Sequence, residues 1–222
     1  CGGFGTSSVV RMNGDGSAIV TTGAMDMGQG LRTVMAQIAA EELGLTLDRV
    51  TVVSGDTDST PYDVGIFGDR GTHTAGMAVR LAAVEARKEV LELAAEKLEA
   101  APEDLDIRNN SVFVKGSPGR SLTLKEVFGG GTYRKGGPII GKCSFNPDTP
   151  PYDPAMVQGA ASRYFSTYTF ATVVADVEVD RATGEVNVIR AIGGNDCGTV
   201  INPNGVEGQI DGGMATGLGF AV

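Results

Sequence analysis

The chain has 222 residues, of which 41% are apolar and 20% charged, a balance that indicates a globular protein with a substantial core rather than a disordered chain. Its net charge of −9, from 27 acidic and 18 basic residues, argues against nucleic acid as a partner, because neutralising phosphates needs clustered Lys and Arg. The widely spaced Cys1, Cys143 and Cys197 argue against a disulfide framework or an iron–sulphur or zinc site, and favour a cytoplasmic location.

Glycine is unusually frequent, with 33 residues, about twice the ordinary share. We find no apolar run long enough for a membrane helix and no secretory signal. Both ends look cut, since the chain begins at Cys1 and closes on the apolar run 219–222. We therefore expect a segment of a larger polypeptide, or one subunit of a split one.

The first elements in chain order are a hairpin, a helix and a strand. A turn at 13–16 leads into a strand at 17–22, which is a good hairpin signal. The segment 28–30 (Gly-Gln-Gly) opens a helix with apolar residues at helical spacing, and Gly44 is placed to end it. The next apolar segment, 50–54, is predicted to be a buried strand.

A long helix is predicted from about residue 74 to residue 99. Pro102, three residues later, prevents its continuation. The apolar residues that we expect to form its buried stripe are Met77, Leu81, Val84, Leu91, Ala95 and Leu98.

The chain then divides. Between 129 and 154, 11 of 26 residues are Gly or Pro, which predicts an irregular connection. Two strands joined by a turn at 180–184 follow it. We predict an α+β fold of mixed sheets with helices packed on one side, in two similar lobes. The first lobe spans 1–128, the irregular Gly/Pro-rich connection spans 129–169, and the start of a second, truncated lobe spans 170–222.

The two lobes share a short pattern. Each has an Asp two residues before a Gly, at 26–28 and 196–198, ahead of a helix with a glutamine near its start, Gln29 or Gln209. One such match is uninformative, but two predict a symmetric site between the lobes.

The glycine motifs have a functional and an ordinary interpretation. Glycines at a helix start expose backbone N–H groups to an anion or a carbonyl-rich ring, and a glutamine adds a donor and an acceptor. Both 28–30 and the segment from 193 to Gln209 fit this description. Either can equally be a turn or a glycine-rich connection.

The acidic loop at 55–71 is less informative. Its carboxylates can ligate a cation or act as acid and base, but no calcium-loop spacing is present, and Asp69 can simply pair with Arg70. Solvated acids are the default interpretation. His73 has no visible nucleophile or orienting partner, which favours a structural role, and we find no nucleophile elbow, phosphate loop or zinc motif.

The order of the motifs is more specific than any one of them. The segments 22–30, 37–44 and 55–58, then Gly71-Thr72 with 76–79, and finally 202–203 with 207–212 resemble the molybdopterin-binding large subunits of the xanthine dehydrogenase and aldehyde oxidase family. The resemblance spans nearly the whole chain.

This resemblance implies that the chain wraps a molybdopterin cofactor with molybdenum, in the cytosine dinucleotide form common in bacteria. Gln29 would bond the pterin or its phosphates, Gln209 would play the matching part, and the turn at 68–72 would lie near the metal or a phosphate. The implied cofactor-binding residues, none of them a direct metal ligand, are Gly28, Gln29, Gly30, Gly68, Asp69, Arg70, Gly71, Thr72, Cys197, Gly198, Asn202 and Gln209.

The chain departs from the family pattern in two ways. Asp69 stands where the family is expected to have serine, and Gly71 replaces another hydroxyl residue. A carboxylate near an anionic cofactor is unfavourable unless it is paired, protonated or turned outward. The family's catalytic glutamate is expected beyond Val222, so the chain would supply hydrogen-bond donors but no base, and we predict no catalytic residue within it.

The implied activity is the hydroxylation or oxidation of an aldehyde, a purine or another N-heteroaromatic substrate, with water as the oxygen source. The implied partners are the remainder of the molybdenum subunit or a split partner, an iron–sulphur subunit and, as a further candidate, an FAD subunit. These partners alone would carry iron–sulphur centres and FAD, so we expect the isolated chain to be inactive. Two alternatives are a non-catalytic scaffold of such a complex, and a self-contained hydrolase or lyase that uses Asp56 and Asp58.

Overall fold

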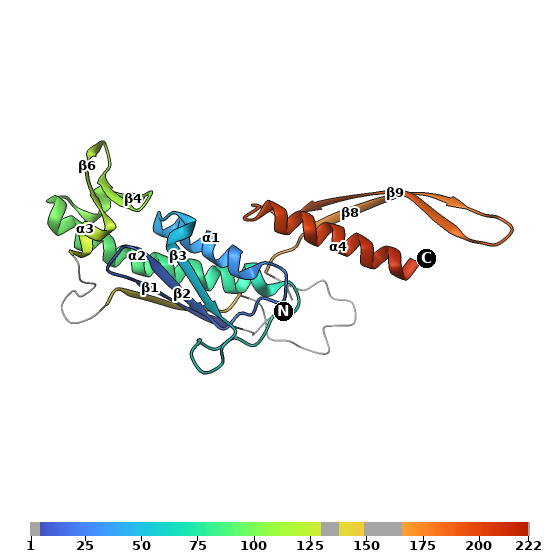
Figure 1. The fold of residues 1–222 in the computed structure, drawn as a ribbon, viewed down its shortest axis with the longest axis horizontal. Helices are drawn as coiled ribbons and strands as arrows, with labels where there is room; N and C mark the ends of the chain where they lie inside the picture. The colour runs from blue at the N-terminus through green and yellow to red at the C-terminus, as the bar shows by residue number, and fades with distance from the viewer. Residues whose placement is uncertain (1–4, 130–137, 149–165, 222) are drawn as a thin grey trace. The chain divides into compact units, whose positions relative to one another are not determined.

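The computed structural model describes residues 5–129, 138–148 and 166–221. The chain forms two compact units, Cys1–Ser166 and Thr167–Val222, each with its own helices and strands (Figure 1). The chain contains both helices and strands, and the strands form separate sheets. This composition agrees with the predicted α+β class.

The first unit is built on a four-stranded mixed sheet in the order β3-β2-β1-β7. Its strands are β1 (Thr6–Met12), β2 (Ala18–Thr22), β3 (Val50–Ser54) and β7 (Ile140–Phe145). The predicted hairpin is present, since β1 and β2 pair antiparallel with Val10 opposite Val20. β2 and β3 are parallel, which requires a crossover connection, and helix α1 (Leu31–Leu43) supplies it.

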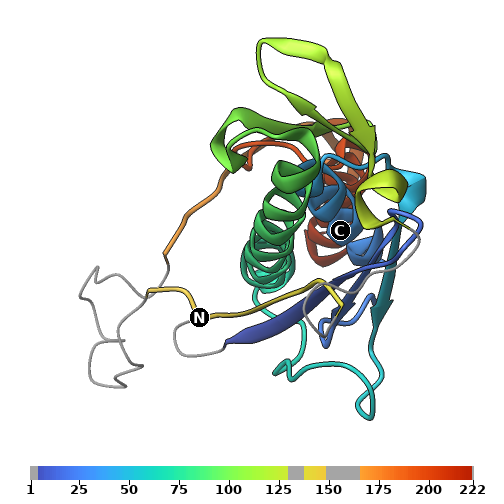
Figure 2. The same ribbon diagram turned by 90° about the vertical axis from the view of Figure 1, so that its left-hand side faces the viewer.

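Helices α1 and α2 (Gly76–Leu98) cover one face of this sheet (Figure 2). Alternate residues of β1, from Thr6 to Met12, point toward the helices and are buried, whereas the residues between them are more exposed. Gly44 adopts a left-handed conformation (φ 70°) and ends α1 as predicted.

The buried face of α2 matches the prediction only in part. Leu98 is buried as predicted, but Leu81 and Val84 are 38% and 40% exposed, and other residues form most of the stripe that faces the protein. Its members are mostly small: Gly76, Ala78, Val79, Ala82, Ala83, Ala86, Val90, Ala94 and Leu98. Small residues are needed because β7 crosses this helix so closely that a Cβ on Gly141 would overlap the Ala82 carbonyl oxygen.

Two further predictions are corrected. The 50–54 segment is a strand, but it lies at the edge of the sheet, and Val53 is 39% exposed. The 129–169 connection is not irregular throughout, because residues 140–145 form β7 and pair with β1. The rest of that predicted connection lies largely outside the described residues.

A smaller three-stranded antiparallel sheet extends the first unit. It contains β4 (Leu105–Arg108), β5 (Ser111–Val114) and β6 (Ser117–Thr123), and it leads into the short helix α3 (Leu124–Phe128). The single turns η1 (Leu47–Arg49) and η3 (Pro102–Asp104) precede β3 and β4.

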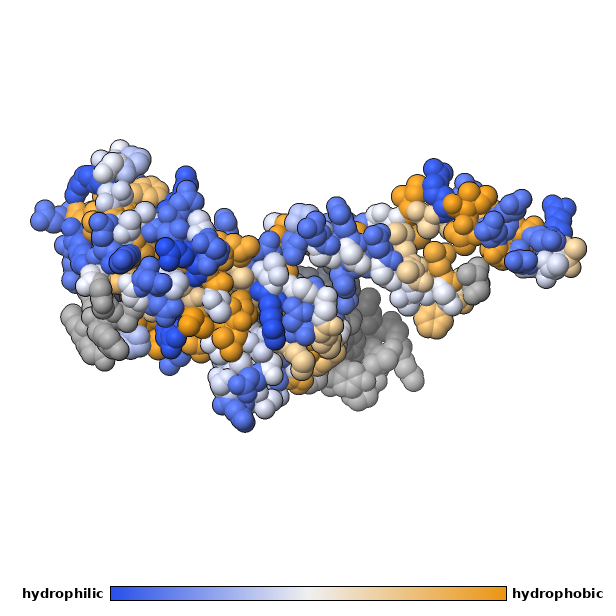
Figure 3. All heavy atoms as spheres, in the orientation of Figure 1, coloured by the Kyte–Doolittle hydropathy of each residue, from blue (hydrophilic) through white to orange (hydrophobic). Residues whose placement is uncertain are grey.

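The second unit is a long hairpin followed by a helix. Strands β8 (Phe170–Val179) and β9 (Val186–Asp196) pair antiparallel, and α4 (Pro203–Ala221) follows them. Gly193 lets the helix approach, since a Cβ there would lie 2.8 Å from both Ile210 and Met214 side chains. Exposed apolar side chains such as Phe170 and Ile189 run along the hairpin (Figure 3).

Candidate functional site

The loop before α1 contains the predicted Gly28-Gln29-Gly30 motif. Gly28 and Gly30 have φ values of 112° and 78°, a backbone conformation that strongly favours glycine. A Cβ placed on either residue would have no atom within 4 Å. The outer surface of this loop is therefore open space rather than a contact with the described part of the chain.

The N–H groups of these glycines are not free, because Asp26 accepts them. Its Oδ1 accepts the N–H of Gly28 at 2.9 Å and that of Gly30 at 3.3 Å, and its Oδ2 accepts the N–H of Arg32 at 3.0 Å. The N–H of Arg32 first, and then that of Gly28, lowers the pKa of Asp26 below its ordinary value. The start of α1 thus already carries a carboxylate as its anion.

The side chain of Gln29 folds back on its own loop. Its Oε1 accepts the N–H of Met27 at 2.6 Å, and its Nε2 donates to the carbonyl of Met25 at 3.3 Å. A glutamine amide has two donor hydrogens and two acceptor lone pairs, so one of each remains available for a ligand.

The second predicted loop lies beside the first. Leu31 begins α1, and a Cβ on Gly71 would lie 3.2 Å from Leu31 Cδ1. Gly71 begins a π-helical turn, Gly71–Ala75, that runs directly into α2. The structure therefore brings the two predicted loops of the first unit together, at the end of the sheet where both helices start (Figure 1).

Arg70 does not pair with Asp69, as the sequence had suggested it could. It is only 5% exposed, and its Nη1 lies 2.9 Å from Oδ1 of Asp63, whose side chain is 1% exposed. The guanidinium also donates to the carbonyls of Gly65 (2.6 Å) and Gly5 (3.3 Å). Asp69 is exposed and has a φ of 57°. The sequence had suggested its pairing with Arg70 only because the two residues are adjacent.

His73 lies inside the π-helical turn. Its ring packs edge to face against that of Phe145, with the two ring centroids 6.3 Å apart, and its Nε2 lies 3.3 Å from Oγ of Ser166. π-helical turns inside helices are frequent at functional sites. The position of this turn, rather than the histidine, is the informative feature.

A group of buried polar residues lies in the first unit, and sequence reasoning had singled out only Arg70 among its side chains. In the described part of the chain the group consists of Thr6, Ser8, Thr22, Arg70 and Thr74. All lie where β1 begins, where β2 ends or where α2 begins, which is the end of the unit that carries the two loops. The hydroxyls of Thr6 and Ser8 find no hydrogen-bond partner among the described residues. Hydroxyl residues in alternate positions of a strand were the available signal.

The second unit carries the remaining predicted residues. Oδ1 of Asp196 accepts the N–H of Gly198 at 3.1 Å, and Gly198 has φ 73°. Asn202 caps α4, since its Oδ1 accepts the N–H of Gly205 at 3.3 Å. Cys197 and Gln209 are exposed, Cys197 on this turn and Gln209 in the first half of α4.

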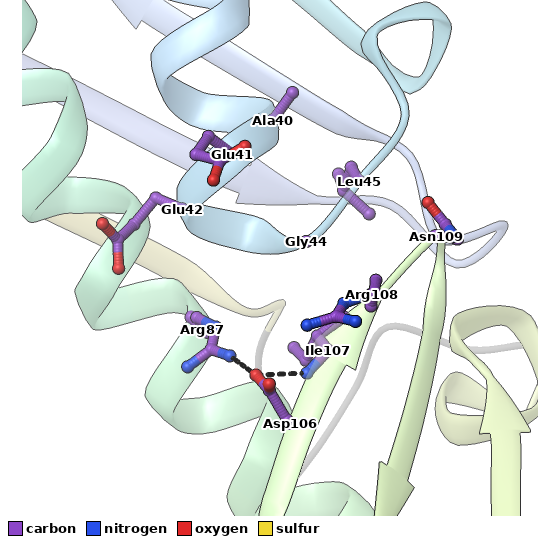
Figure 4. Close-up of a pocket in the computed structure, with 10 residues that line it drawn as sticks. All are labelled: Ala40, Glu41, Glu42, Gly44, Leu45, Arg87, Asp106, Ile107, Arg108 and Asn109. Carbon is purple, nitrogen blue, oxygen red and sulfur yellow. Dashed lines mark hydrogen bonds and ion pairs between the residues drawn. The ribbon is translucent and has the colours of Figure 1, made fainter. Parts of the chain in front are cut away.

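A cleft of about 460 Å³ lies elsewhere on the first unit, at the C-terminal end of α1 (Figure 4). Glu41, Arg87 and Arg108 line it, and Arg87 forms an ion pair with Asp106. None of the predicted cofactor-binding residues lines this cleft.

The described residues, 5–129, 138–148 and 166–221, contain neither a metal-binding cluster nor a membrane-spanning helix. No group of three or more His, Cys, Asp or Glu side chains there is arranged to hold a metal ion. No helix in those ranges is long and apolar enough to cross a membrane.

Comparison with known proteins decides the family. The family model of the molybdopterin cofactor-binding domain matches residues 2–222. The chain belongs to this family. The resemblance that the motif order predicted is therefore confirmed, and this molybdopterin-binding domain covers the whole chain.

Relatives of the domain are larger proteins. The carbon monoxide dehydrogenase large chain of Hydrogenophaga pseudoflava is 36% identical over 220 residues, which are 99% of this chain and 26% of that protein. The xanthine dehydrogenase molybdenum-binding subunit of Escherichia coli is 33% identical over 95% of the chain and 26% of its own length. The domain thus spans about a quarter of the length of these relatives.

Solved structures of similar fold support the same family assignment. Quinoline 2-oxidoreductase from Pseudomonas putida 86 is 31% identical and superposes with a TM-score of 0.81 over 96% of this chain and 26% of that chain. The copper- and molybdenum-containing CO dehydrogenase is 31% identical with a TM-score of 0.78, over 94% of this chain and 25% of that one.

The residues present fit a molybdopterin group at the first unit. The glycine loop is open on its outer surface, and Gln29 retains a donor and an acceptor that a pterin edge requires. The N–H groups of Gly28 and Gly30 do not fit a phosphate, because Asp26 already accepts them.

Proposed function

We propose that the joined starts of α1 and α2 hold the molybdopterin of a molybdenum hydroxylase. The contact between Leu31 and Gly71 carries this proposal, because it places the Gly28–Gly30 loop beside the π-helical turn. Within this arrangement Gln29 offers its free amide hydrogen and lone pair to the pterin. Gly28 and Gly30 admit the ring because they have no side chain above the loop.

The remaining residues that we propose for cofactor binding belong to the second unit. Gln209 is proposed to bond the pterin, and Cys197, Gly198 and Asn202 to bond the nucleotide end, in the cytosine dinucleotide form. Phosphates are better held there or at Gly68 and Thr72 than at the start of α1, where they would meet the carboxylate of Asp26.

We assign a different part to Arg70. Its guanidinium is enclosed by Asp63 and by two backbone carbonyls, so it anchors the 63–71 loop from inside. Asp69, Gly68 and Thr72 are the surface of that loop that can approach a cofactor.

The bound cofactor would supply two-electron oxidation, and the protein supplies binding and orientation. We propose that the complete enzyme is a cytoplasmic complex that oxidises or hydroxylates an aldehyde, a purine or another N-heteroaromatic compound, with water as the oxygen source. The remainder of the molybdenum subunit, an iron–sulphur subunit and an FAD subunit are the proposed partners. The catalytic base is proposed to come from outside this domain.

The test is metal and pterin analysis of the native complex. Wild type should contain molybdenum and pterin in near one-to-one ratio with this domain, and Gln29→Ala should lower both. Lys88→Ala is the control, since Lys88 is an exposed residue of α2 that is not among the proposed cofactor-binding residues. An active complex without molybdenum would overturn the proposal.

A scaffold role is the second candidate. The exposed carboxylate of Asp69 and the occupied N–H groups at the start of α1 favour it. In that case Gln29→Ala would leave the molybdenum content and the activity of the complex unchanged.

A further inference from the structure

We propose that Asp26 is a positioning residue, which holds the Gly28–Gly30 loop and Gln29 in the conformation that receives the cofactor. The inference rests on the proposed function of this loop. It assigns to Asp26 a role through Gln29 rather than a contact with the cofactor itself.

Asp26 ties the whole loop to the first turn of α1. One carboxylate oxygen accepts the N–H groups of Gly28 and Gly30, and the other accepts that of Arg32. Glycine loses more conformational freedom on ordering than any other residue, and two glycines with positive φ flank Gln29. Hydrogen bonds to a charged acceptor are stronger than neutral ones, so Asp26 is the group that compensates for ordering this loop.

The orientation of Gln29 depends on the same turn. The two backbone groups that hold its amide belong to Met25 and Met27, the neighbours of Asp26 on either side. Displacement of Asp26 therefore moves both anchors of the Gln29 side chain. The remaining bonding groups of the amide point toward a ligand only while these anchors stay in place.

The second unit repeats one part of the arrangement. Asp196 accepts the N–H of Gly198, two residues later, and that glycine again has a positive φ. The sequence pattern that the two units share is thus a shared hydrogen-bonded turn. Gln29 follows the first turn directly, before α1, and Gln209 follows the second turn within α4.

Asp15 makes a simpler turn. Asp15 accepts the N–H of Ser17 at 2.9 Å, two residues later, in the β1–β2 turn, at the opposite end of these strands from the loop. No glycine-flanked glutamine or helix start depends on it. Asp15 therefore provides a matched control for the loss of one carboxylate in a turn.

The experiment compares Asp26→Ala, Asp26→Asn and Asp15→Asn in the intact native complex. Groups that orient metal-binding side chains typically contribute about tenfold or more to metal affinity, and we take the lower end for a group that orients a cofactor contact. We expect Asp26→Ala to lower molybdenum and pterin content about tenfold under limiting cofactor. Asp26→Asn keeps one acceptor oxygen and should retain more molybdenum and pterin than Asp26→Ala. Asp15→Asn should have the molybdenum and pterin content of wild type. The electron paramagnetic resonance signal of Mo(V) in the loaded fraction should change in the Asp26 variants, because a displaced Gln29 alters the surroundings of the cofactor.

The outcomes are distinguishable. Full occupancy and an unchanged Mo(V) signal in Asp26→Ala would overturn the positioning role while leaving the proposed function intact. Lower occupancy with an unchanged signal and a lowered thermal midpoint would also overturn it, since that combination reports only a less stable domain. Wild-type complex that is active without molybdenum would instead overturn the proposed function.

Discussion

The side chain of Leu31 lies against Gly71, so that the first residue of α1 contacts the first residue of the π-helical turn. The contact leaves little room, since a Cβ on Gly71 would be 3.2 Å from Leu31 Cδ1. This close approach, and not the backbone angles, favours glycine here, because Gly71 is not among the positive-φ residues.

Replacing Gly71 by valine should separate the two helix starts. Overpacking of this kind costs about 1–3 kcal/mol, and the free energy of unfolding in urea should fall by that amount. Leu31→Ala removes the atoms that a larger residue would meet. The double variant Leu31→Ala/Gly71→Val should therefore be destabilised by less than the sum of the two single variants. Strict additivity would show that the contact does not set the spacing.

The ion pair of Arg70 and Asp63 gives a second prediction. Both side chains are nearly inaccessible to water, and removing one partner leaves an uncompensated buried charge, at a cost of about 3–5 kcal/mol. Arg70→Gln should lower the free energy of unfolding by that amount in urea denaturation.

Arg49 provides the control for this variant. It pairs with Asp15 at 3.8 Å, with side chains 43% and 59% exposed, and an exposed pair contributes about 0–1 kcal/mol. Arg49→Gln should therefore leave the unfolding midpoint almost unchanged. Equal effects of the two Arg variants would contradict the assignment of Arg70 as a buried anchor.

Local signals predicted much of the fold. The turn at 13–16, the helix ended by Gly44 and the 180–184 turn are all present where the sequence indicated. Each of these depends on residues that are close in the chain, such as a glycine that adopts a left-handed conformation.

The errors concern partners distant in sequence. Periodicity could not tell which face of α2 is buried, because the decision comes from β7, some 60 residues later, whose Gly141 admits only small side chains beneath it. The edge position of β3 likewise depends on the strand order, which pairing at long range sets.

The candidate site was predictable to a similar extent. Motif order identified the glycine loops, but Asp26 was noted only as part of a repeated pattern. Its three hydrogen bonds depend on the folded path of the loop. Arg70 and Asp63 are joined by an irregular loop rather than by a helix or strand, so their spacing did not reveal the pairing in the sequence.

The lowered pKa of Asp26 predicts how stability depends on pH. Its folded pKa lies below the ordinary value of 3.8, chiefly because the N–H of Arg32 stabilises the carboxylate. The contribution to stability is therefore present above the unfolded pKa and is lost as pH falls through the folded pKa.

NMR titration of the carboxyl groups should place the Asp26 midpoint below 3.8. The unfolding free energy of wild type should decrease more steeply below about pH 4 than that of Asp26→Asn, which has no charge to lose. A midpoint at or above the ordinary value would mean that the three N–H groups do not bind this carboxylate.

The crossing of β7 over α2 gives the last prediction. A Cβ on Gly141 would overlap the carbonyl oxygen of Ala82 and lie 2.6 Å from the backbone nitrogen of Ala86. Both atoms belong to helix backbone and cannot rotate away, so Gly141→Ala must push the strand off the helix. We expect a loss of about 3 kcal/mol in the free energy of unfolding, at the upper end of overpacking effects. Gly119→Ala is the matched control, because a Cβ there meets no atom within 4 Å and the residue has no positive φ. If Gly141→Ala unfolds at the same urea concentration as Gly119→Ala, the strand does not lie against the alanine face of α2.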